Sequence, residues 1–377
     1  MARSRLMAKL DAAIAAAANP IEAKCLRAER AGLLARQGQL EAAKAVIDEF
    51  NAQLAWQPNT PLRAWVALAE GLHGYYSTLG LGALTSFEQA YMLAQGQAAL
   101  KRLHALAAAW LAHMAFANED MARTATLVRE ALDVAMPEHH GVRARAALVV
   151  GYAYHFAAGN TRAHPWYEAS RRHAIAEGDE THLSALMHNQ AALRASQARL
   201  ALLFDTAGNG AAQSDAVSHA LMGAESIGHY DAGIGTASLA SLVPMLRAQV
   251  LAAQGRWAEA LALFETHFDL ALSDGLARQS PCLLADRAWC EWHSGQARKA
   301  KALAAAAEQA LAQPCDTDDR AMAHARLAQV SDVLGDAVAA QRHREAAQIH
   351  YAAHREQQQG VLTLLDQALV GLQPAQV

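Results

Sequence analysis

Aromatic side chains are scarce in this chain of 377 residues, at 6%, although 53% of its residues are hydrophobic. Alanine supplies most of the difference, and alanine is both the strongest helix former and small enough to let helices pack closely. The composition therefore predicts an all-helical protein. Because a single compact core normally stops growing below this length, we expect several domains or one elongated array of repeats.

The chain also lacks the features of nucleic-acid-binding and membrane proteins. Its formal net charge is −4, with 32 basic and 36 acidic residues, and it has no clustered basic face of the kind that nucleic acid requires. No uninterrupted apolar run reaches the roughly 18 residues needed to cross a bilayer. We therefore expect neither nucleic acid nor a membrane among its partners.

Signals of export are weak. The four cysteines show no CxxC spacing, which is typical of a reducing compartment. The N-terminal segment has basic residues before an alanine run, as a signal peptide does, but Asp11 interrupts its apolar part. Leu6, Leu10 and Ile14 recur every four residues, which indicates an amphipathic helix instead. These features predict a cytoplasmic protein.

Known catalytic motifs are missing as well: the chain has no GxSxG, no Walker loop and no Cys–His nucleophile pair. His350 and His354 have the spacing of a zinc-binding pair on one helix face, but no HExxH accompanies them. Asp316, Asp318 and Asp319 precede a renewed helical pattern, where aspartate caps a helix and interacts favourably with its dipole. We therefore predict no metal, no cofactor and no enzyme. An all-helical metal-dependent enzyme with a His- and Asp-lined central cavity is the alternative.

What the chain does contain is a recurring interruption of its helical pattern. The intervals from Asn118 to Gly159, from Gly255 to Gly295 and from Gly295 to Gly335 are 41, 40 and 40 residues. Two helical segments in a period of this length indicate a solenoid, in which each helix pair buries its apolar face against its neighbours. We expect about eight or nine such units.

Each interruption has a physical interpretation. Glycine at the end of a helix adopts the left-handed conformation that ends it, and the next helix then begins almost at once. A small alanine follows five residues after the glycine at four places, which are Ala43, Ala260, Ala300 and Ala340. We interpret these alanines as spacers that let the partner helix approach closely. Beside Ala260, an apolar stripe comprises Trp257, Leu261, Phe264, Phe268 and Leu272.

The segment around Gly255 resembles the tetratricopeptide repeat (TPR) family. Gly255 fits the family's turn between helices, and Ala260 followed by Phe264 fits its second-helix pattern. Other units depart from it, since Ala304 and Arg344 stand where the aromatic residue belongs, and the period exceeds the family's. The chain is more similar to the long-repeat variants in bacterial regulators and sensory proteins.

The resemblance implies a right-handed α-solenoid over residues 1–359, followed by a C-terminal capping or docking helix and tail over residues 360–377. It also implies a non-enzymatic scaffold or regulatory module in bacterial signalling. Such a module binds a protein or peptide on its concave face.

We predict that polar and aromatic residues on the first helix of each pair bind the ligand. These helices line the inner face of such arrays, and Trp and Arg are enriched at binding hot spots. The predicted residues are Tyr152, His155, His188, Asn189, Arg194, Arg247, Trp289 and Trp292.

The C-terminal segment carries a narrow apolar seam formed by Leu362, Leu365, Leu369 and Leu372. A terminal solenoid helix normally has a polar outer face. We therefore expect this segment either to fold back as a cap or to dock on a partner or on a second copy of the chain, which would give a homodimer.

Overall fold

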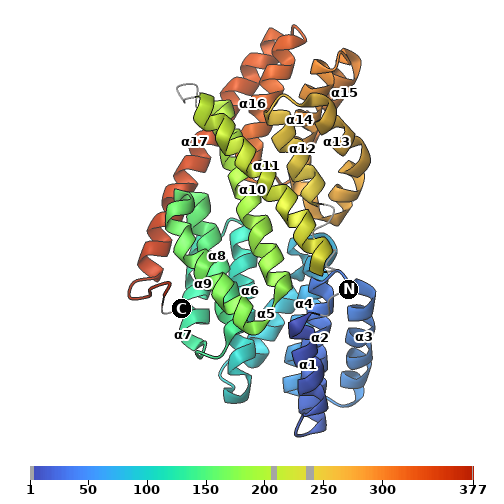
Figure 1. Ribbon diagram of the computed structural model, residues 1–377, viewed down its shortest axis with the longest axis vertical. Coiled ribbons are helices and arrows are strands. Elements are labelled where there is room, and N and C mark those ends of the chain that lie inside the picture. The colour runs from blue at the N-terminus through green and yellow to red at the C-terminus, as the bar shows by residue number, and fades with distance from the viewer. Residues whose placement is uncertain (1–3, 205–209, 235–241, 376) are drawn as a thin grey trace. The chain divides into compact units, whose positions relative to one another are not determined.

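The computed structural model describes residues 4–204, 210–234, 242–375 and 377, and these residues are helical throughout their regular structure, without a strand (Figure 1). The prediction of an all-α protein is confirmed. The chain forms two compact units. Unit 1 comprises Met1–Leu186, Tyr230–Ser238 and Gln359–Val377, and unit 2 comprises Met187–His229 and Leu239–Gln358.

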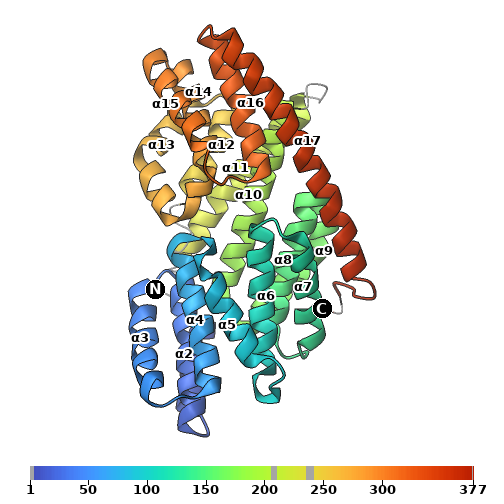
Figure 2. The ribbon, with the colours of Figure 1, turned by 180° about the vertical axis from the view of Figure 1, so that it is seen from behind.

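Unit 1 is built mainly from consecutive helix pairs. Its helices are α1 (Arg5–Ala15), α2 (Pro20–Arg36), α3 (Leu40–Trp56), α4 (Thr60–Thr78), α5 (Leu84–Ala94), α6 (Lys101–Ala117), α7 (Met121–Val134), α8 (His140–Ala158) and α9 (Asn160–Glu177), with short 3₁₀ turns at Leu81–Ala83 and Ala98–Leu100. Helix α6 packs against α7 and α8 against α9, as Figure 2 shows. Three further helices each have one end in unit 1: α10 (Glu180–Phe204), α11 (Gly210–Ile234) and α17 (Ala337–Ala368).

Unit 2 repeats the same construction. It contains the remaining parts of α10, α11 and α17 together with α12 (Leu242–Ala253), α13 (Trp257–Ala271), α14 (Ser280–His293), α15 (Ala297–Ala310) and α16 (Thr317–Val333). Helix α12 pairs with α13 and α14 with α15. A π turn at Leu272–Leu276 and a 3₁₀ turn at Ala277–Gln279 join the two pairs.

The turns follow the predicted chemistry. Five glycines at predicted interruptions have positive φ, with 81° at Gly38, 76° at Gly159, Gly255 and Gly295, and 81° at Gly335. At the Asn118 interruption the left-handed residue is the neighbouring Glu119, at φ 59°. The four spacer alanines Ala43, Ala260, Ala300 and Ala340 are all 0% exposed. Both the helix-ending role of these glycines and the close packing at the alanines are confirmed.

The predicted apolar seam packs on the core of unit 1 at the end of α17 and in the residues that follow it, with Leu362 and Leu372 only partly buried. The chain re-enters unit 1 at Gln359, and Gly360 lies inside α17 rather than at a helix boundary. Leu365 and Leu369 are 2% and 6% exposed in the core of unit 1. This burial agrees with the folded-back cap, whereas the homodimer stays a prediction. None of the described helices is long and apolar enough to cross a bilayer.

Candidate functional site

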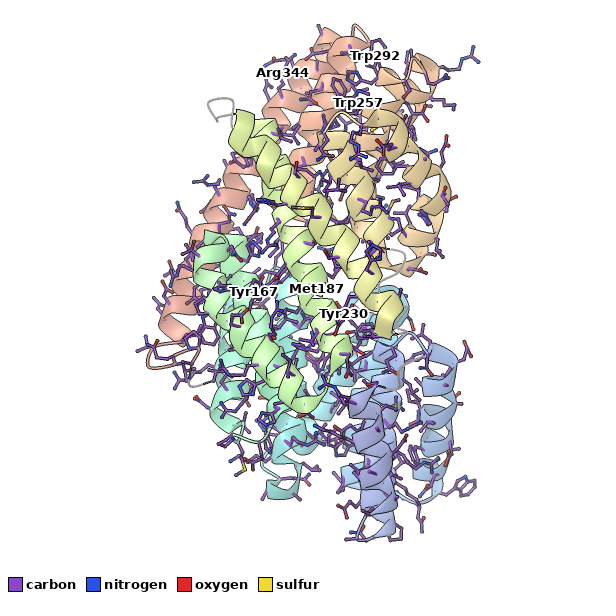
Figure 3. The ribbon with its side chains drawn as sticks, viewed as in Figure 1. Tyr167, Met187, Tyr230, Trp257, Trp292 and Arg344 are labelled. Atoms are coloured by element: carbon purple, nitrogen blue, oxygen red, sulfur yellow. The ribbon has the colours of Figure 1, made fainter. Side chains whose placement is uncertain are left out.

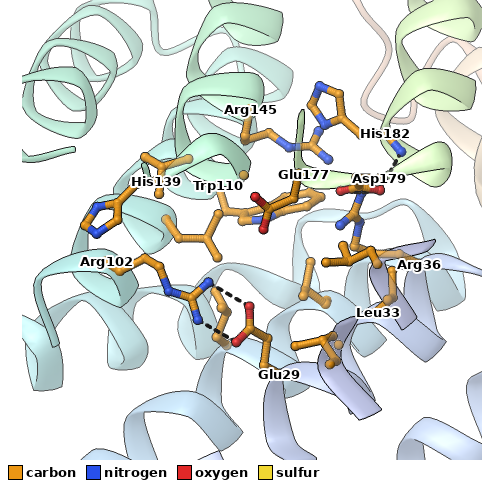
Figure 4. Close-up of a pocket in the computed structure, with 18 of the residues that line it drawn as sticks. Glu29, Leu33, Arg36, Arg102, Trp110, His139, Arg145, Glu177, Asp179 and His182 are labelled. Carbon is orange, nitrogen blue, oxygen red and sulfur yellow. Dashed lines mark hydrogen bonds and ion pairs between the residues drawn. The ribbon is translucent and has the colours of Figure 1, made fainter. Parts of the chain in front are cut away.

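Unit 1 contains a cavity of about 80 Å³ lined by both charged and apolar side chains. Figure 4 shows the side chains of Arg145 and Glu177 over the ring of Trp110, with one arginine–carboxylate pair on either side of them. The cavity is formed by residues of α1, α2, α4, α6, α8 and α9, the turn before α8 and the start of α10. Its apolar walls include Leu33, Leu68, Leu72, Leu106 and Val142.

One ion pair joins α6 to α2. The Arg102 guanidinium donates from Nη1 and Nη2 to the two carboxylate oxygens of Glu29, at 2.8 and 2.5 Å. The same guanidinium lies 4.8 Å above the ring of Trp65. This bidentate geometry satisfies both charges within the protein.

A second ion pair joins α2 to the N-terminus of α10. Arg36 Nη2 lies 2.9 and 2.8 Å from the two carboxylate oxygens of Asp179. Asp179 also accepts a hydrogen bond from the backbone N–H of His182 at 2.9 Å, as a helix cap does. Burial raises the pKa of Asp179, but the charge of Arg36 and these hydrogen bonds outweigh burial, and the pKa lies below its usual value. Asp179 is therefore ionised and paired.

Two of the three histidines that line the cavity, His139 and His182, are held neutral, and the third, His140, lies with its Nδ1 3.0 Å from that of His173. Burial, and then the charge of Arg145, lower the pKa of His182 well below its usual value, and its Nε2 lies 2.8 Å from Ser170 Oγ. Burial and the charge of Arg102 lower the pKa of His139, whose Nδ1 accepts from the backbone N–H of Met136 at 3.2 Å. Neither ring therefore adds charge to the cavity near neutral pH.

Arg145 differs from the other two arginines because no carboxylate pairs with it. Its side chain is buried, with the residue 3% exposed, and its guanidinium carbon lies 3.7 Å from the centre of the Trp110 ring. The guanidinium forms no hydrogen bond or ion pair with any described residue, and Nη2 is fully enclosed. Burial lowers the pKa of Arg145, but a guanidinium stays protonated in proteins. The cavity thus holds one uncompensated cation.

Among the acidic residues of the cavity, Glu177 is the half-buried carboxylate that no described arginine pairs with. Its carboxylate has no hydrogen bond or ion pair with a described residue. Burial raises the pKa of Glu177, and the nearby charges of Glu29 and Asp179 add to this effect while Arg102 opposes it. Arg145 and Glu177 form no ion pair with each other.

The eight ligand residues predicted from the sequence lie elsewhere. Tyr152 and His155 are on α8 in unit 1, whereas the other six are on α10, α12 and α14 in unit 2. None of the eight lines the unit 1 cavity. Their role in one concave groove stays a prediction.

Packing accounts for several of these side chains. His155 is fully buried, with Nδ1 3.1 Å from the hydroxyl of Tyr167, and the ring of Tyr152 lies 5.0 Å from that of Phe116. In unit 2, the ring of Trp289 lies 4.4 Å from that of His293. Burial lowers the pKa of His188 to about 4.

Arg194 and Asn189 on α10 and Arg247 on α12 are half-buried. Trp292, labelled in Figure 3, lies on α14 and is half-buried as well.

One feature of the sequence does point to the cavity, which is a charged residue inside an apolar helical run. Arg145 stands in the run ARAALVVG, whose residues from Ala144 to Gly151 are all buried. A charged residue inside a helical segment that is apolar on every side is costly to bury. Such a residue is therefore a better pointer to a site than the exposed-face polar residues that hot-spot composition favours.

The residues considered as metal ligands are engaged otherwise. His350 stacks on His324 with ring centres 5.5 Å apart. Asp316 occupies the N-cap position of α16 and pairs with Arg278. Among the described residues, no group of three or more His, Cys, Asp or Glu side chains has an arrangement that could hold a metal ion.

Comparison with known proteins gives no assignment. No protein-family model matches the chain, and no curated protein matches it. Functional inference therefore depends on the geometry of the cavity.

Proposed function

We propose that this chain is a non-enzymatic binding module in which unit 1 recognises an anionic group, a carboxylate or a phosphate, on a small ligand. The observation that carries the proposal is the buried guanidinium of Arg145, which lines the cavity and forms no hydrogen bond or ion pair with any described residue. An unpaired buried charge destabilises a fold, whereas an incoming anion would satisfy it. Arginine also matches carboxylate and phosphate oxygens in a bidentate geometry.

The wider architecture extends this proposal. We propose that the helix pairs of each unit stack as a TPR-like solenoid, which the left-handed glycines and the buried alanines at a period of about forty residues support. On the resemblance alone, the module would act in the bacterial cytoplasm as a signalling scaffold with a protein or peptide partner. The metal-dependent alternative gains no support, because Asp179 and Glu29 pair with arginines instead of converging on a common point.

Replacing Arg145 with methionine tests the proposal. Methionine keeps apolar contact with Trp110 but removes the charge. In wild-type protein, acetate or inorganic phosphate should raise the thermal midpoint relative to chloride at the same ionic strength. Stabilisation should reach about 1.4 kcal/mol at ten times the Kd, and the rise should vanish in Arg145→Met. Without ligand, Arg145→Met should unfold at equal or higher urea, because the unpaired cation is gone.

The matched control is Arg123→Met, which removes a half-exposed arginine of α7 that pairs with Glu88 outside the cavity. This variant should keep the full response to acetate and phosphate. An equal response in Arg145→Met, or none in the wild type, would refute the assignment of the site.

A further inference from the structure

Among the described residues, the cavity contains an unpaired carboxylate as well as an unpaired cation. Two of its arginines are neutralised by carboxylates, Arg102 by Glu29 through two nitrogens and Arg36 by Asp179 through Nη2. Both histidines next to these pairs are neutral, as their lowered pKa values require. Apart from His140, which contacts His173, what remains inside the cavity is one cation, Arg145, and one carboxylate, Glu177. Glu138, a further lining residue, is exposed to solvent.

The two remaining charges do not satisfy each other. Both side chains point into the same cavity (Figure 4), yet they form no ion pair. Burial is the largest influence on the pKa of both groups, and Asp179 acts on both of them. Arg145 lies on α8 against the Trp110 ring, whereas Glu177 is the last residue of α9. A ligand that carries both a negative and a positive group would pair with each of them.

We propose that the ligand of unit 1 is a small zwitterion, an α-amino acid with an apolar side chain, whose carboxylate binds Arg145 and whose ammonium binds Glu177. This inference rests on the proposed function, because it assigns the anionic group to the same arginine. It adds the second charge and therefore the class of ligand.

The remaining walls fit the rest of such a ligand. Leu33, Leu68 and Leu72 face the cavity from α2 and α4, and the indole ring of Trp110 forms part of its lining. The cavity volume of about 80 Å³ is less than that of three water molecules at about 30 Å³ each, so the smallest apolar amino acids should fit best and affinity should fall as the side chain grows. Small sites of this kind combine apolar walls with a few polar groups that fix the ligand's orientation.

The test compares amino acids with analogues that lack one charge. Isothermal titration calorimetry on the full chain would use alanine, valine and leucine. The matched acids without the amino group are propanoate, 3-methylbutanoate and 4-methylpentanoate, and the matched amines are ethylamine, 2-methylpropylamine and 3-methylbutylamine. At least one amino acid should bind about tenfold or more tightly than both its acid and its amine, since each analogue leaves one buried charge unpaired.

Glu177→Gln isolates the second contact. The glutamine has the same shape without the charge, so this variant should still bind the acid but lose the preference for the amino acid. The control is Glu168→Gln, which changes an exposed carboxylate on the same helix α9 and should keep the wild-type preference. Circular dichroism and the thermal midpoint establish that both variants are folded.

Each result separates the two proposals. Equal affinity for an amino acid and its acid would overturn the zwitterion while anion binding stands. A preference that survives in Glu177→Gln would overturn the role of Glu177. No binding of any acid or amino acid, at concentrations up to tens of millimolar, would overturn both the zwitterion and the proposed function.

Discussion

Small side chains decide how closely the helices pack. Ala260 is fully buried on α13, and its neighbours along the apolar stripe, Phe264 and Phe268, are buried too. The stripe makes α13 amphipathic, but Ala260 lets the next helix approach. A larger residue at this position would need space that a close-packed interior does not contain.

Ala260→Leu is therefore expected to destabilise unit 2 by about 1–3 kcal/mol through overpacking. Ala262→Leu, at an exposed position on the same helix, makes the same chemical change on the solvent side. It should alter stability by no more than about 0.5 kcal/mol. Urea unfolding followed by circular dichroism measures both. Identical midpoints for the two variants would contradict the role of Ala260 as a spacer.

The sequence around Arg145 predicts that this residue is buried but not whether it has a partner. Its position in an apolar run indicates burial, but nothing in the run shows whether a carboxylate from another helix will reach it. Arg36 and Arg102 do find such partners, Asp179 and Glu29. The difference arises from side chains distant in the sequence, so the sequence alone does not separate the paired arginines from the unpaired one.

Helices in unit 2 are joined by a buried ionic contact as well as by apolar packing. Asp286 on α14 is 1% exposed and contacts Arg199 of α10 at 2.5 Å and Arg326 of α16 at 3.1 Å. Arg199 also lies 2.9 Å from the sulfur of Cys282. One carboxylate thus holds three helices in register.

Asp286→Asn is expected to destabilise unit 2 by about 3–5 kcal/mol, because it leaves two buried guanidinium groups without their counter-charge. Asp332→Asn makes the same change in a half-exposed pair with Arg344 and should cost at most about 1 kcal/mol. The urea midpoints of the two variants check this order. A cost for Asp286→Asn no larger than that for Asp332→Asn would show that the buried contact adds little to stability.

The sequence predicted helix ends correctly at the glycine turns, but it did not predict that α17 continues through Gly360. The predicted interruptions at Gly255, Gly295 and Gly335 each separate two helices, since a glycine with positive φ ends the first of them. Gly360 does not end α17. One glycine inside a helix costs only about 1 kcal/mol relative to alanine, and burial of Val361 and Leu365 in unit 1 outweighs that cost.

Histidine burial governs how the whole chain responds to acid. Burial comes first among the causes that lower the pKa of nine described histidines, to about 3 for His113 and about 4 for His188 and His324. Three carboxyl groups shift the other way, with raised pKa values, and these are Glu177, Asp231 and Asp319. Because these histidines are more numerous, we expect acidification to favour the unfolded state.

The free energy of unfolding should therefore fall as the pH drops from about 7 to about 5. Below about pH 6.5 the unfolded chain takes up protons on histidines that stay neutral in the folded state, at up to about 1.4 kcal/mol per pH unit for each. His113→Gln removes one such group and should weaken the dependence. Urea midpoints measured at several pH values test this. A midpoint that is unchanged or higher at about pH 5 would mean that the raised carboxyl groups dominate.

The sequence by itself determined the helical class, the glycine turns and the alanine contacts of this protein, because these depend on residues close together in the chain. The division into two units and the cavity of unit 1 were decided by the tertiary structure alone. Whether a buried charge such as Arg145 or Glu177 is paired depends on which distant side chains reach it, and that is a property of the packed helices.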